Sequence, residues 1–325
     1  MSLVAPRRLA IATACATFFL ILIGGLVHNT RSSLACPDWP LCFGSAFPKM
    51  VGGVFYEHSH RIAATTVGLL TTVLAVLLGL RGRRFLLIGL GALGLVVFQG
   101  LLGGITVLYR LPTMVSTTHL ATSLAFFAYL IWVVFQLREE GASRPLELST
   151  SLRRLVAVAA AAVYFQCLVG ALMRHLGAGL ACVVSDHPGY ADVVLCHGAL
   201  YPFGQHPSLQ LHAFHRLLAL VVGALVTVAA VQVFQAAAGR PALRAIAVAL
   251  PAIVLIQIAL GVASLVTFLD VLPVTAHLGG AALLLAGLWT IYLSSFPATF
   301  RANSPAPSQR EMAAPTPASH EIQRA

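Results

Sequence analysis

The chain has 325 residues, of which 58% are hydrophobic and 9% are charged, and its mean hydropathy is +0.89. A composition this apolar excludes a soluble globular domain and predicts a polytopic membrane protein, with the lipid bilayer as its surroundings. The formal net charge of +10 comes largely from arginines that flank the apolar segments, so it gives no reason to expect a nucleic acid partner.

Eight apolar segments are long enough to cross a membrane, for which a helix needs about 20 mostly apolar residues. In chain order they cover about residues 9–28, 60–80, 85–105, 115–136, 155–174, 210–235, 245–267 and 273–294. The first segment is too long for the apolar region of a signal peptide, and no small-residue cleavage site follows it. The predicted fold class is therefore an all-α polytopic membrane protein with eight transmembrane helices.

Basic residues gather on one of the two sides that these spans define. That side contains Arg7, Arg8, Arg81, Arg83, Arg84, Arg138, Arg144, Arg153, Arg154, Arg240 and Arg244, with Arg301, Arg310 and Arg324 in the tail. The opposite side contains Arg31, Lys49, Arg61, Arg110, Arg174 and Arg216. By the positive-inside rule, both termini are expected in the cytoplasm.

The two halves of the chain resemble each other in sequence. Residues 24–36 align with residues 170–182 without a gap, and residues 99–103 align with residues 257–261. Since each half holds an even number of spans, both halves have the same orientation, which is typical of a parallel duplication. We therefore predict two pseudo-symmetric four-helix bundles. The predicted parts are residues 1–137, a cytoplasmic linker at 138–154, residues 155–296 and a disordered tail at 297–325.

Four histidines occupy matched positions in the two halves: His60 and His119 in the first, His215 and His277 in the second. Each lies near the start of a span that runs from outside to inside, so all four are expected at a similar depth near the outer face. An ionisable side chain inside a membrane segment is costly and marks a functional site. Paired imidazoles on facing helices are typical axial ligands of a b-type haem. Hydrogen-bonded helix packing and the proton relay of a transporter are the alternatives.

Glu57 distinguishes the first half from the second. It lies three residues before His60 and on the same helical face, whereas the aligned residue in the second half is His212. A carboxylate beside one histidine pair can accept a proton or stabilise a cationic intermediate, so the first half is the expected place for chemistry. A charge that complements the dipole at a helix N-terminus is the alternative. His58 points away from His60 on a helix and is left outside the predicted site.

Arg61 and Arg216 directly follow two of the matched histidines. A guanidinium near the membrane interface can pair with the propionates of a haem, and it can equally extend to the lipid headgroups. Both arginines are therefore candidates for propionate contacts, with a headgroup contact as the alternative.

Four cysteines lie in the two long loops on the outer side: Cys36 and Cys42 in one, Cys182 and Cys196 in the other. An oxidising outer compartment favours disulfides, so each loop is expected to contain one. The spacing of the first pair does not fit a usual zinc knuckle. A redox-active pair that exchanges electrons with an external thiol carrier is the alternative for that pair. The histidines of the second loop are expected to be solvated rather than bound to copper or zinc.

These motifs together resemble those of the haem A synthase family, in its bacterial branch with loop cysteine pairs. The resemblance rests on residues 24–27, on Cys36-Pro37-Asp38-Trp39-Pro40-Leu41-Cys42, on Glu57-His58-Ser59-His60-Arg61 and on the surroundings of the three later histidines. It covers about residues 9–294. Members of the family have eight helices in two four-helix halves and lie in the bacterial cell membrane. They oxidise the C8 methyl group of haem O to a formyl group, which yields haem A for terminal oxidases.

The resemblance implies a role for each site residue. His60 and His119 would receive the substrate haem O, and His215 and His277 would ligate the iron of a haem b cofactor that transfers electrons. Glu57 matches a family carboxylate tied to catalysis. An alcohol intermediate is expected before the aldehyde.

The expected partners are haem O and haem A, with a haem O synthase, an electron-transfer protein and a second copy of the chain as further candidates. One alternative from another class explains the four histidines equally well: a dihaem b-type cytochrome that only transfers electrons. It explains neither the difference between Glu57 and His212 nor the first cysteine loop.

Overall fold

Eight long helices make up most of the molecule. The computed structural model describes residues 3–138, 144–184 and 188–298, and in these ranges eight helices are long and apolar enough to cross a membrane. They are α1 (Val4–Asn29), α2 (Gly53–Gly79), α3 (Arg83–Leu108), α4 (Thr113–Gln136), α5 (Thr150–His175), α7 (Pro207–Ala236), α8 (Pro241–Val266) and α9 (Val271–Ser294). The predicted all-α membrane fold is therefore confirmed.

Several helices extend beyond the apolar segments that predicted them. α2 begins at Gly53 rather than near residue 60, and α7 begins at Pro207. Hydropathy marks the part of a helix that crosses the hydrocarbon, whereas backbone hydrogen bonding continues the helix through polar residues at the interface. Glu57 and His58 consequently lie inside α2.

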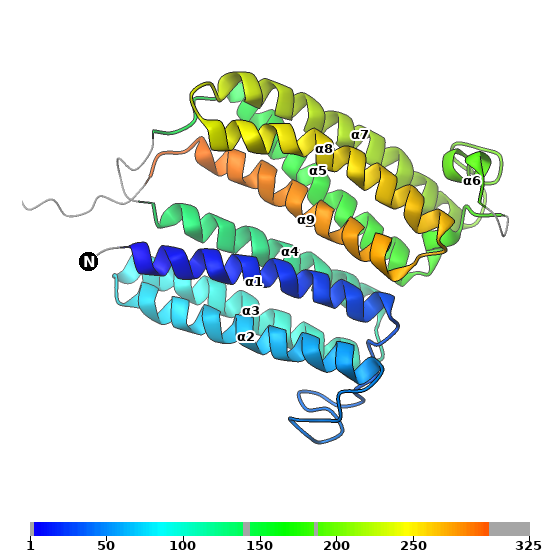
Figure 1. The fold of residues 1–325 in the computed structure, drawn as a ribbon, viewed down its shortest axis with the longest axis horizontal. Coiled ribbons are helices and arrows are strands. Elements are labelled where there is room, and N and C mark those ends of the chain that lie inside the picture. The colour runs from blue at the N-terminus through cyan, green and yellow to red at the C-terminus, as the bar shows by residue number, and fades with distance from the viewer. Residues whose placement is uncertain (1–2, 139–143, 185–187, 299–325) are drawn as a thin grey trace, which may run out of the picture.

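The long helices form two rings of four, which lie side by side in Figure 1. In the first ring α1 packs against α2, α2 against α3, α3 against α4, and α4 against α1. In the second ring α5, α7, α8 and α9 follow the same order. α2 and α4 are therefore diagonal partners in the first ring, as are α7 and α9 in the second. This pattern is consistent with the predicted matched halves.

Hydrogen bonds join the two rings where α4 meets α5 and α9. Trp289 of α9 donates its Nε1–H to the backbone oxygen of Ala128 on α4 at 2.9 Å. Tyr164 of α5 donates its hydroxyl to the backbone oxygen of Ala121 on α4, also at 2.9 Å. Side-chain donors that find acceptors on a neighbouring helix stabilise helix association in a bilayer. The rings are thus held together by polar contacts as well as by apolar packing.

The connection between the rings lies close to the second ring. Residues 150–154, at the end of the predicted linker, already belong to α5. Leu146 donates its backbone N–H to the backbone oxygen of Ser294 at the end of α9, at 2.7 Å. Residues 139–143 of the linker lie outside the described residues. The tail is predicted to be disordered, and from residue 299 onward it also lies outside the described residues.

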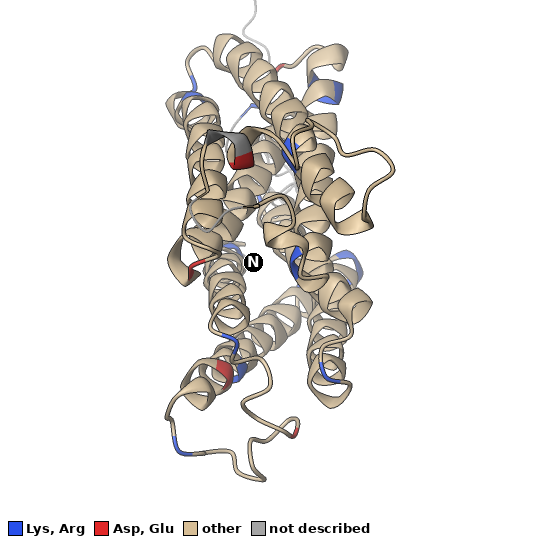
Figure 2. Cartoon of the chain, turned by 90° about the vertical axis from the view of Figure 1, so that its right-hand side faces the viewer, with Lys and Arg blue, Asp and Glu red and all other residues tan. Residues whose placement is uncertain are grey.

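Both long loops emerge from the same end of the molecule. The N-terminus lies at the opposite end, together with the connection between the rings (Figure 1). The loop after α5 contains two short helices, η1 (Ala178–Leu180) and α6 (Tyr190–Val194), which hydropathy does not reveal. Figure 2 looks onto this loop end and shows the few charged residues in loops and near helix ends. The cytoplasmic location of the termini stays a prediction.

Candidate functional site

Each of the four matched histidines lies against a glycine on the helix that precedes its own in the ring. The distances from an ideal Cβ on the glycine to histidine Cε1 are 3.1 Å for Gly24 and His60, 3.2 Å for Gly103 and His119, 3.0 Å for Gly170 and His215, and 3.7 Å for Gly261 and His277. The first three distances are shorter than ordinary van der Waals contact, so a larger residue would displace the ring. The repeated contact places each imidazole directly beside a neighbouring helix backbone.

The histidines pair across each ring of helices. His60 on α2 and His119 on α4 lie on diagonal helices of the first ring. His215 on α7 and His277 on α9 repeat this arrangement in the second ring. Two imidazoles on opposite helices of a four-helix bundle can serve as the two axial ligands of a haem iron.

A glutamine orients one histidine of each pair. Gln99 Nε2 lies 3.1 Å from His119 Nδ1, and Gln166 Nε2 lies 3.2 Å from His215 Nδ1. Each amide also donates to the backbone oxygen of the same histidine, at 2.8 Å and 2.9 Å. An amide nitrogen only donates, so these contacts hold the ring and the backbone of the histidine in place but do not supply the acceptor that a metal-bound imidazole needs for its second N–H. Gln99 lies in residues 99–103, which align with residues 257–261, and this alignment is the sequence signal that could have identified it.

The other histidine of each pair has a buried ring nitrogen without a partner. Within the described residues, neither His60 Nδ1 nor His277 Nδ1 forms a hydrogen bond, and Gln257 Nε2 on α8 also lacks one. A buried polar atom left unpaired costs free energy, so such atoms indicate an interaction that the polypeptide alone does not supply. The residues present therefore fit axial ligation of a haem in each ring.

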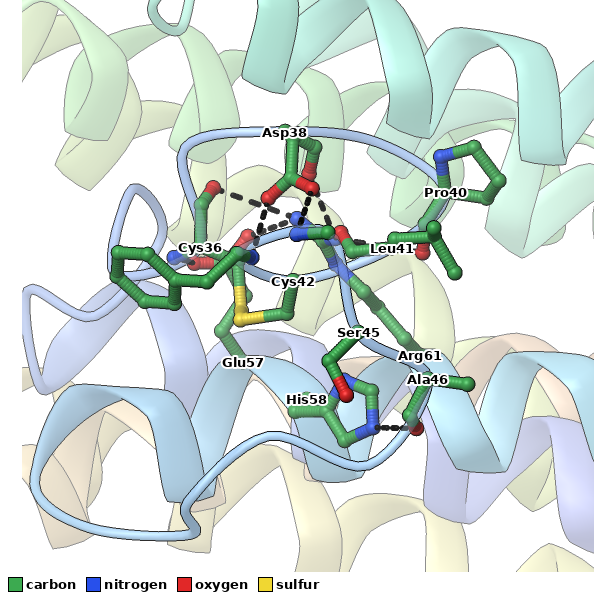
Figure 3. Close-up of a disulfide and its surroundings, with 12 residues drawn as sticks. Cys36, Asp38, Pro40, Leu41, Cys42, Ser45, Ala46, Glu57, His58 and Arg61 are labelled. Atoms are coloured by element: carbon green, nitrogen blue, oxygen red, sulfur yellow. Dashed lines mark hydrogen bonds and ion pairs between the residues drawn. A yellow bond between two sulfur atoms is a disulfide. The ribbon is translucent and has the colours of Figure 1, made fainter.

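Glu57 connects the first turns of α2 to the disulfide loop that precedes this helix (Figure 3). Its Oε2 accepts a hydrogen bond from the backbone N–H of Cys36 at 2.7 Å, and its Oε1 accepts one from Arg61 Nη2 at 2.6 Å. The residue is only 4% exposed, so its ion pair with Arg61 is largely shielded from water. Both carboxylate oxygens are engaged, which fixes the carboxylate one turn before His60.

Arg61 lies beneath the loop, and its guanidinium is directed at loop carbonyls (Figure 3). Nη1 donates to the backbone oxygen of Asp38 at 2.7 Å and to that of Leu41. The Asp38 carboxylate in turn accepts from the backbone N–H groups of Gly44 at 2.8 Å and Phe43 at 2.7 Å. These donors, that of Gly44 above all, hold the pKa of the exposed Asp38 carboxyl below its ordinary value. The first loop is thus held by two charged side chains, Arg61 of α2 and Asp38 of the loop itself.

The second half repeats this arrangement with a different residue in place of the carboxylate. The backbone N–H of Cys182 donates to His212 Nδ1 at 3.4 Å, as that of Cys36 does to Glu57. Arg216 Nη1 donates to the backbone oxygen of Asp192 at 2.8 Å and to others in the same loop. Nε and Nη2 of Arg216 are buried and form no hydrogen bond within the described chain.

Each long loop contains the disulfide that was expected there. Cys36 is joined to Cys42 with their Cα atoms 4.8 Å apart, and Cys182 is joined to Cys196 with their Cα atoms 4.5 Å apart. All four cysteines are buried. A backbone bridge follows each disulfide, between Cys42 and Ser45 and between Cys196 and Ala199. The halves therefore repeat the loop architecture as well as the helices.

Two four-helix rings, each with a diagonal histidine pair and a disulfide loop at one end, define a duplicated bis-histidine membrane protein. Residues 7–52 and 50–289 match the model of the family COX15-CtaA, described as cytochrome oxidase assembly protein. These residues make up most of the chain, which belongs to this family, that of the haem A synthases.

Several curated relatives carry the name heme A synthase. The one from Shewanella oneidensis is 27% identical over 310 residues, which cover 85% of this chain and 92% of the relative. The one from Alkalihalophilus pseudofirmus is 28% identical over 222 residues, with 66% and 71% covered. The one from Exiguobacterium sibiricum is 32% identical over 190 residues, with 54% and 63% covered. The first of these similarities extends over both rings.

Proposed function

We propose that this chain is a haem A synthase, which oxidises the C8 methyl group of haem O to a formyl group through an alcohol and so supplies haem A-containing terminal oxidases. Its relatives are named for heme A synthesis, and its family is named for cytochrome oxidase assembly. The observation that carries the proposal is a buried carboxylate, Glu57, in one of two otherwise matched halves, where the other half has His212. A protein that only passes electrons between two equivalent haems has no use for that difference.

His60 and His119 bind the substrate haem in this proposal, and His215 and His277 hold haem b. The glycine contacts and the buried unpaired ring nitrogens support ligation in both rings. A haem b held by His215 and His277 would supply reversible one-electron transfer, and so would pass the electrons taken from the substrate to an acceptor outside the chain. Arg216 offers two buried donors, Nε and Nη2, to an anionic group such as a propionate.

Glu57 is proposed to stabilise positive charge that develops on the methyl carbon. Reaching the alcohol removes one pair of electrons and a proton from that carbon, which then bonds to the oxygen of a water molecule that releases a proton. Reaching the aldehyde removes a second pair of electrons and two protons. A fixed carboxylate nearby lowers the free energy of an electron-poor carbon, and Glu57 is held in place by Arg61 and by the N–H of Cys36. Proton abstraction is the alternative role of Glu57, because each carboxylate oxygen keeps a second lone pair beside the bond that it accepts.

Pigment extraction tests the proposed function. The full-length protein is produced together with a supply of haem O, purified and extracted with acidified acetone, and the pigments are identified by mass spectrometry. Haem b accompanied by haem O, its hydroxymethyl derivative or haem A is the expected result. Haem b alone would overturn the synthase and favour the dihaem cytochrome.

A further inference from the structure

A histidine lies beside the first disulfide, outside the proposed haem site. His58 of α2 is 6% exposed, and Cys36 and Cys42 are fully buried. The two Sγ atoms and a ring nitrogen of His58 lie within 4.8 Å of one another. Figure 3 shows this imidazole on the helix under the loop, next to the disulfide. Among the described residues, these three form the one group of metal-ligating type whose ligand atoms lie this close together.

The hydrogen bond of His58 leaves one ring nitrogen available. His58 Nε2 lies 3.1 Å from the backbone oxygen of Ala46, and because a carbonyl only accepts, Nε2 carries the proton. Nδ1 of the neutral ring therefore has a free lone pair. This atom is buried and has no hydrogen-bond partner in the part of the chain that the structure describes. Metal-binding histidines typically donate one N–H to a backbone carbonyl in this way and bind the metal through the other nitrogen.

Contacts other than the disulfide bond hold the loop against α2. Glu57 accepts from the N–H of Cys36, and Arg61 donates to the backbone oxygen of Asp38. The Asp38 carboxylate also accepts from two backbone N–H groups just beyond Cys42. Both cysteines therefore stay near the imidazole when the S–S bond is opened. A ligand set that is already assembled loses little conformational entropy on binding.

The second half of the chain is an internal comparison for this cluster. The residue aligned with His58 is Ala213, which packs against Cys182 and Cys196 in a small apolar cluster. His212, one residue earlier, uses its Nδ1 to accept from the N–H of Cys182. The same loop architecture thus occurs in this chain without a third ligand beside the sulfurs.

We propose that reduction of the Cys36–Cys42 disulfide creates a binding site for a thiophilic d10 metal ion, with Cu(I) preferred to Zn(II). A dithiol reductant exchanges with the disulfide and is itself oxidised to a disulfide. The two cysteine thiols then release their protons to solvent as their sulfurs bind the metal, and His58 Nδ1 completes the set as a neutral ligand. Thiolates select Cu(I) and Zn(II), and three ligands suit Cu(I) because structural Zn(II) normally takes four. The three ligand positions do not depend on the proposed haem chemistry.

Metal titration of the full-length protein in detergent micelles tests this site. One sample stays oxidised, and a second is reduced with a phosphine that is removed by anaerobic gel filtration. Free thiols are counted in both by alkylation and mass spectrometry. Cu(I) is then titrated in competition with a chromophoric Cu(I) chelator, and Zn(II) with a zinc indicator. To remove the other loop pair, the protein carries Cys182→Ser and Cys196→Ser, and the wild-type chain is titrated in parallel.

The reduced protein is expected to bind one more Cu(I) per chain than the oxidised protein, with a thiolate-to-metal charge-transfer band. His58→Ala, which copies the residue of the second half, should weaken this binding by about 10–100-fold or more. His197→Ala is the matched control, because His197 Nε2 also lies near a backbone oxygen, that of Ala181, but the residue is outside the cluster. This variant should bind Cu(I) as the parent does.

Three results would each overturn the proposal: equal Cu(I) binding before and after reduction, equal affinity of His58→Ala and its parent, or a first disulfide that the phosphine cannot open in the folded protein. Tighter binding of Zn(II) than of Cu(I), each compared through its own competitor, would overturn the choice of metal. The pigment content of the same samples is measured separately, so failure of the metal site and failure of the synthase proposal are distinguishable.

Discussion

The two disulfide loops of this protein differ in length but are held by matching contacts, and the long helices that hold them, α2 and α7, differ at two adjacent positions. In each half, the N–H of the first loop cysteine is bound by a side chain of the following long helix, and an arginine one turn further on donates to loop carbonyls. The two adjacent positions that differ are Glu57 and His58 in the first half and His212 and Ala213 in the second. The shared framework sets where the side chains lie, and two residues decide which chemistry that place can support.

The two histidine pairs also share their placement on the helices but differ in the contacts of individual rings. Each pair lies on diagonal helices, and each contains one ring that a glutamine supports and one whose Nδ1 is unpaired within the described residues. The supported ring is His119 in the first half and His215 in the second. The residue aligned with Gln166 is Leu20, so His60 has no equivalent support. The histidine pair is therefore repeated in the two rings, whereas the glutamine contact falls on a different member of the pair in each.

Removal of a proposed iron ligand should give the largest difference in pigment content between the two rings. His215→Ala should empty the second ring of haem b, whereas His60→Ala should retain haem b and lose haem O. Loss of an axial ligand should exceed the effect of losing an outer hydrogen-bond partner, which is about 10–100-fold in affinity. Pigments extracted per folded chain measure both. If both variants lost haem b to the same degree while remaining monodisperse on gel filtration, the two sites would not be separate.

Glu57→Gln should give the next largest effect, because it removes the charge that distinguishes the halves. The amide oxygen can still accept from the N–H of Cys36, so the loop contact is kept. Loss of one electrostatic stabiliser should slow haem A formation by about 10²–10³-fold, with haem O or the alcohol accumulating. His212→Gln, at the matched position of the second half, should change product formation far less. Wild-type levels of haem A from Glu57→Gln would remove the carboxylate from the mechanism.

The helices and the histidine pairs could be predicted from the sequence because both depend on strong constraints. Apolar segments of about 20 residues have few alternatives to a membrane helix. The gap-free alignment of residues 24–36 with residues 170–182 then identifies corresponding residues of the two halves. The bonds of Arg61 could not be predicted in this way, because they depend on how the loop folds back onto α2.

His58 shows where helical geometry alone was insufficient. On a helix this residue points away from His60, so it was left outside the predicted site. The position of His58 along α2 fixes the face of the helix on which it lies but not the segment that covers this face. The covering segment is the Cys36–Cys42 loop, whose position is set by hydrogen bonds between residues far apart in the sequence. Gln166 was missed for a similar reason, because a glutamine in a span has no unique partner until the helices are placed.

Gln166→Leu should have a smaller effect, since it makes the surroundings of His215 resemble those of His60. The ring loses the amide that fixes its orientation, so haem b should bind about 10-fold more weakly, at the low end of outer-partner effects. Retention of haem b during dilution of the purified protein measures the change. Gln99→Leu is the reciprocal variant and should leave haem b unchanged. Equal loss of haem b from both variants would contradict an independent second ring.

Removal of the two disulfides should give the smallest difference between the halves, in the free energy of unfolding. In the chain-entropy model the stabilisation grows with the length of the closed loop, and the sequence separations are 6 for Cys36–Cys42 and 14 for Cys182–Cys196. Removing the first pair with serines should therefore cost about 2 kcal/mol of unfolding free energy, and removing the second about 3 kcal/mol. Thermal unfolding in one detergent, followed by the reaction of the half-buried Cys167 with a thiol-reactive dye, measures the difference. Removal of the first disulfide should be the milder of the two because that disulfide closes the shorter loop, and the contacts of Glu57 and Arg61 then keep that loop in place. If the first pair proved the more stabilising, those contacts would depend on the disulfide, and reduction would disperse the cluster around His58 instead of preparing it for a metal.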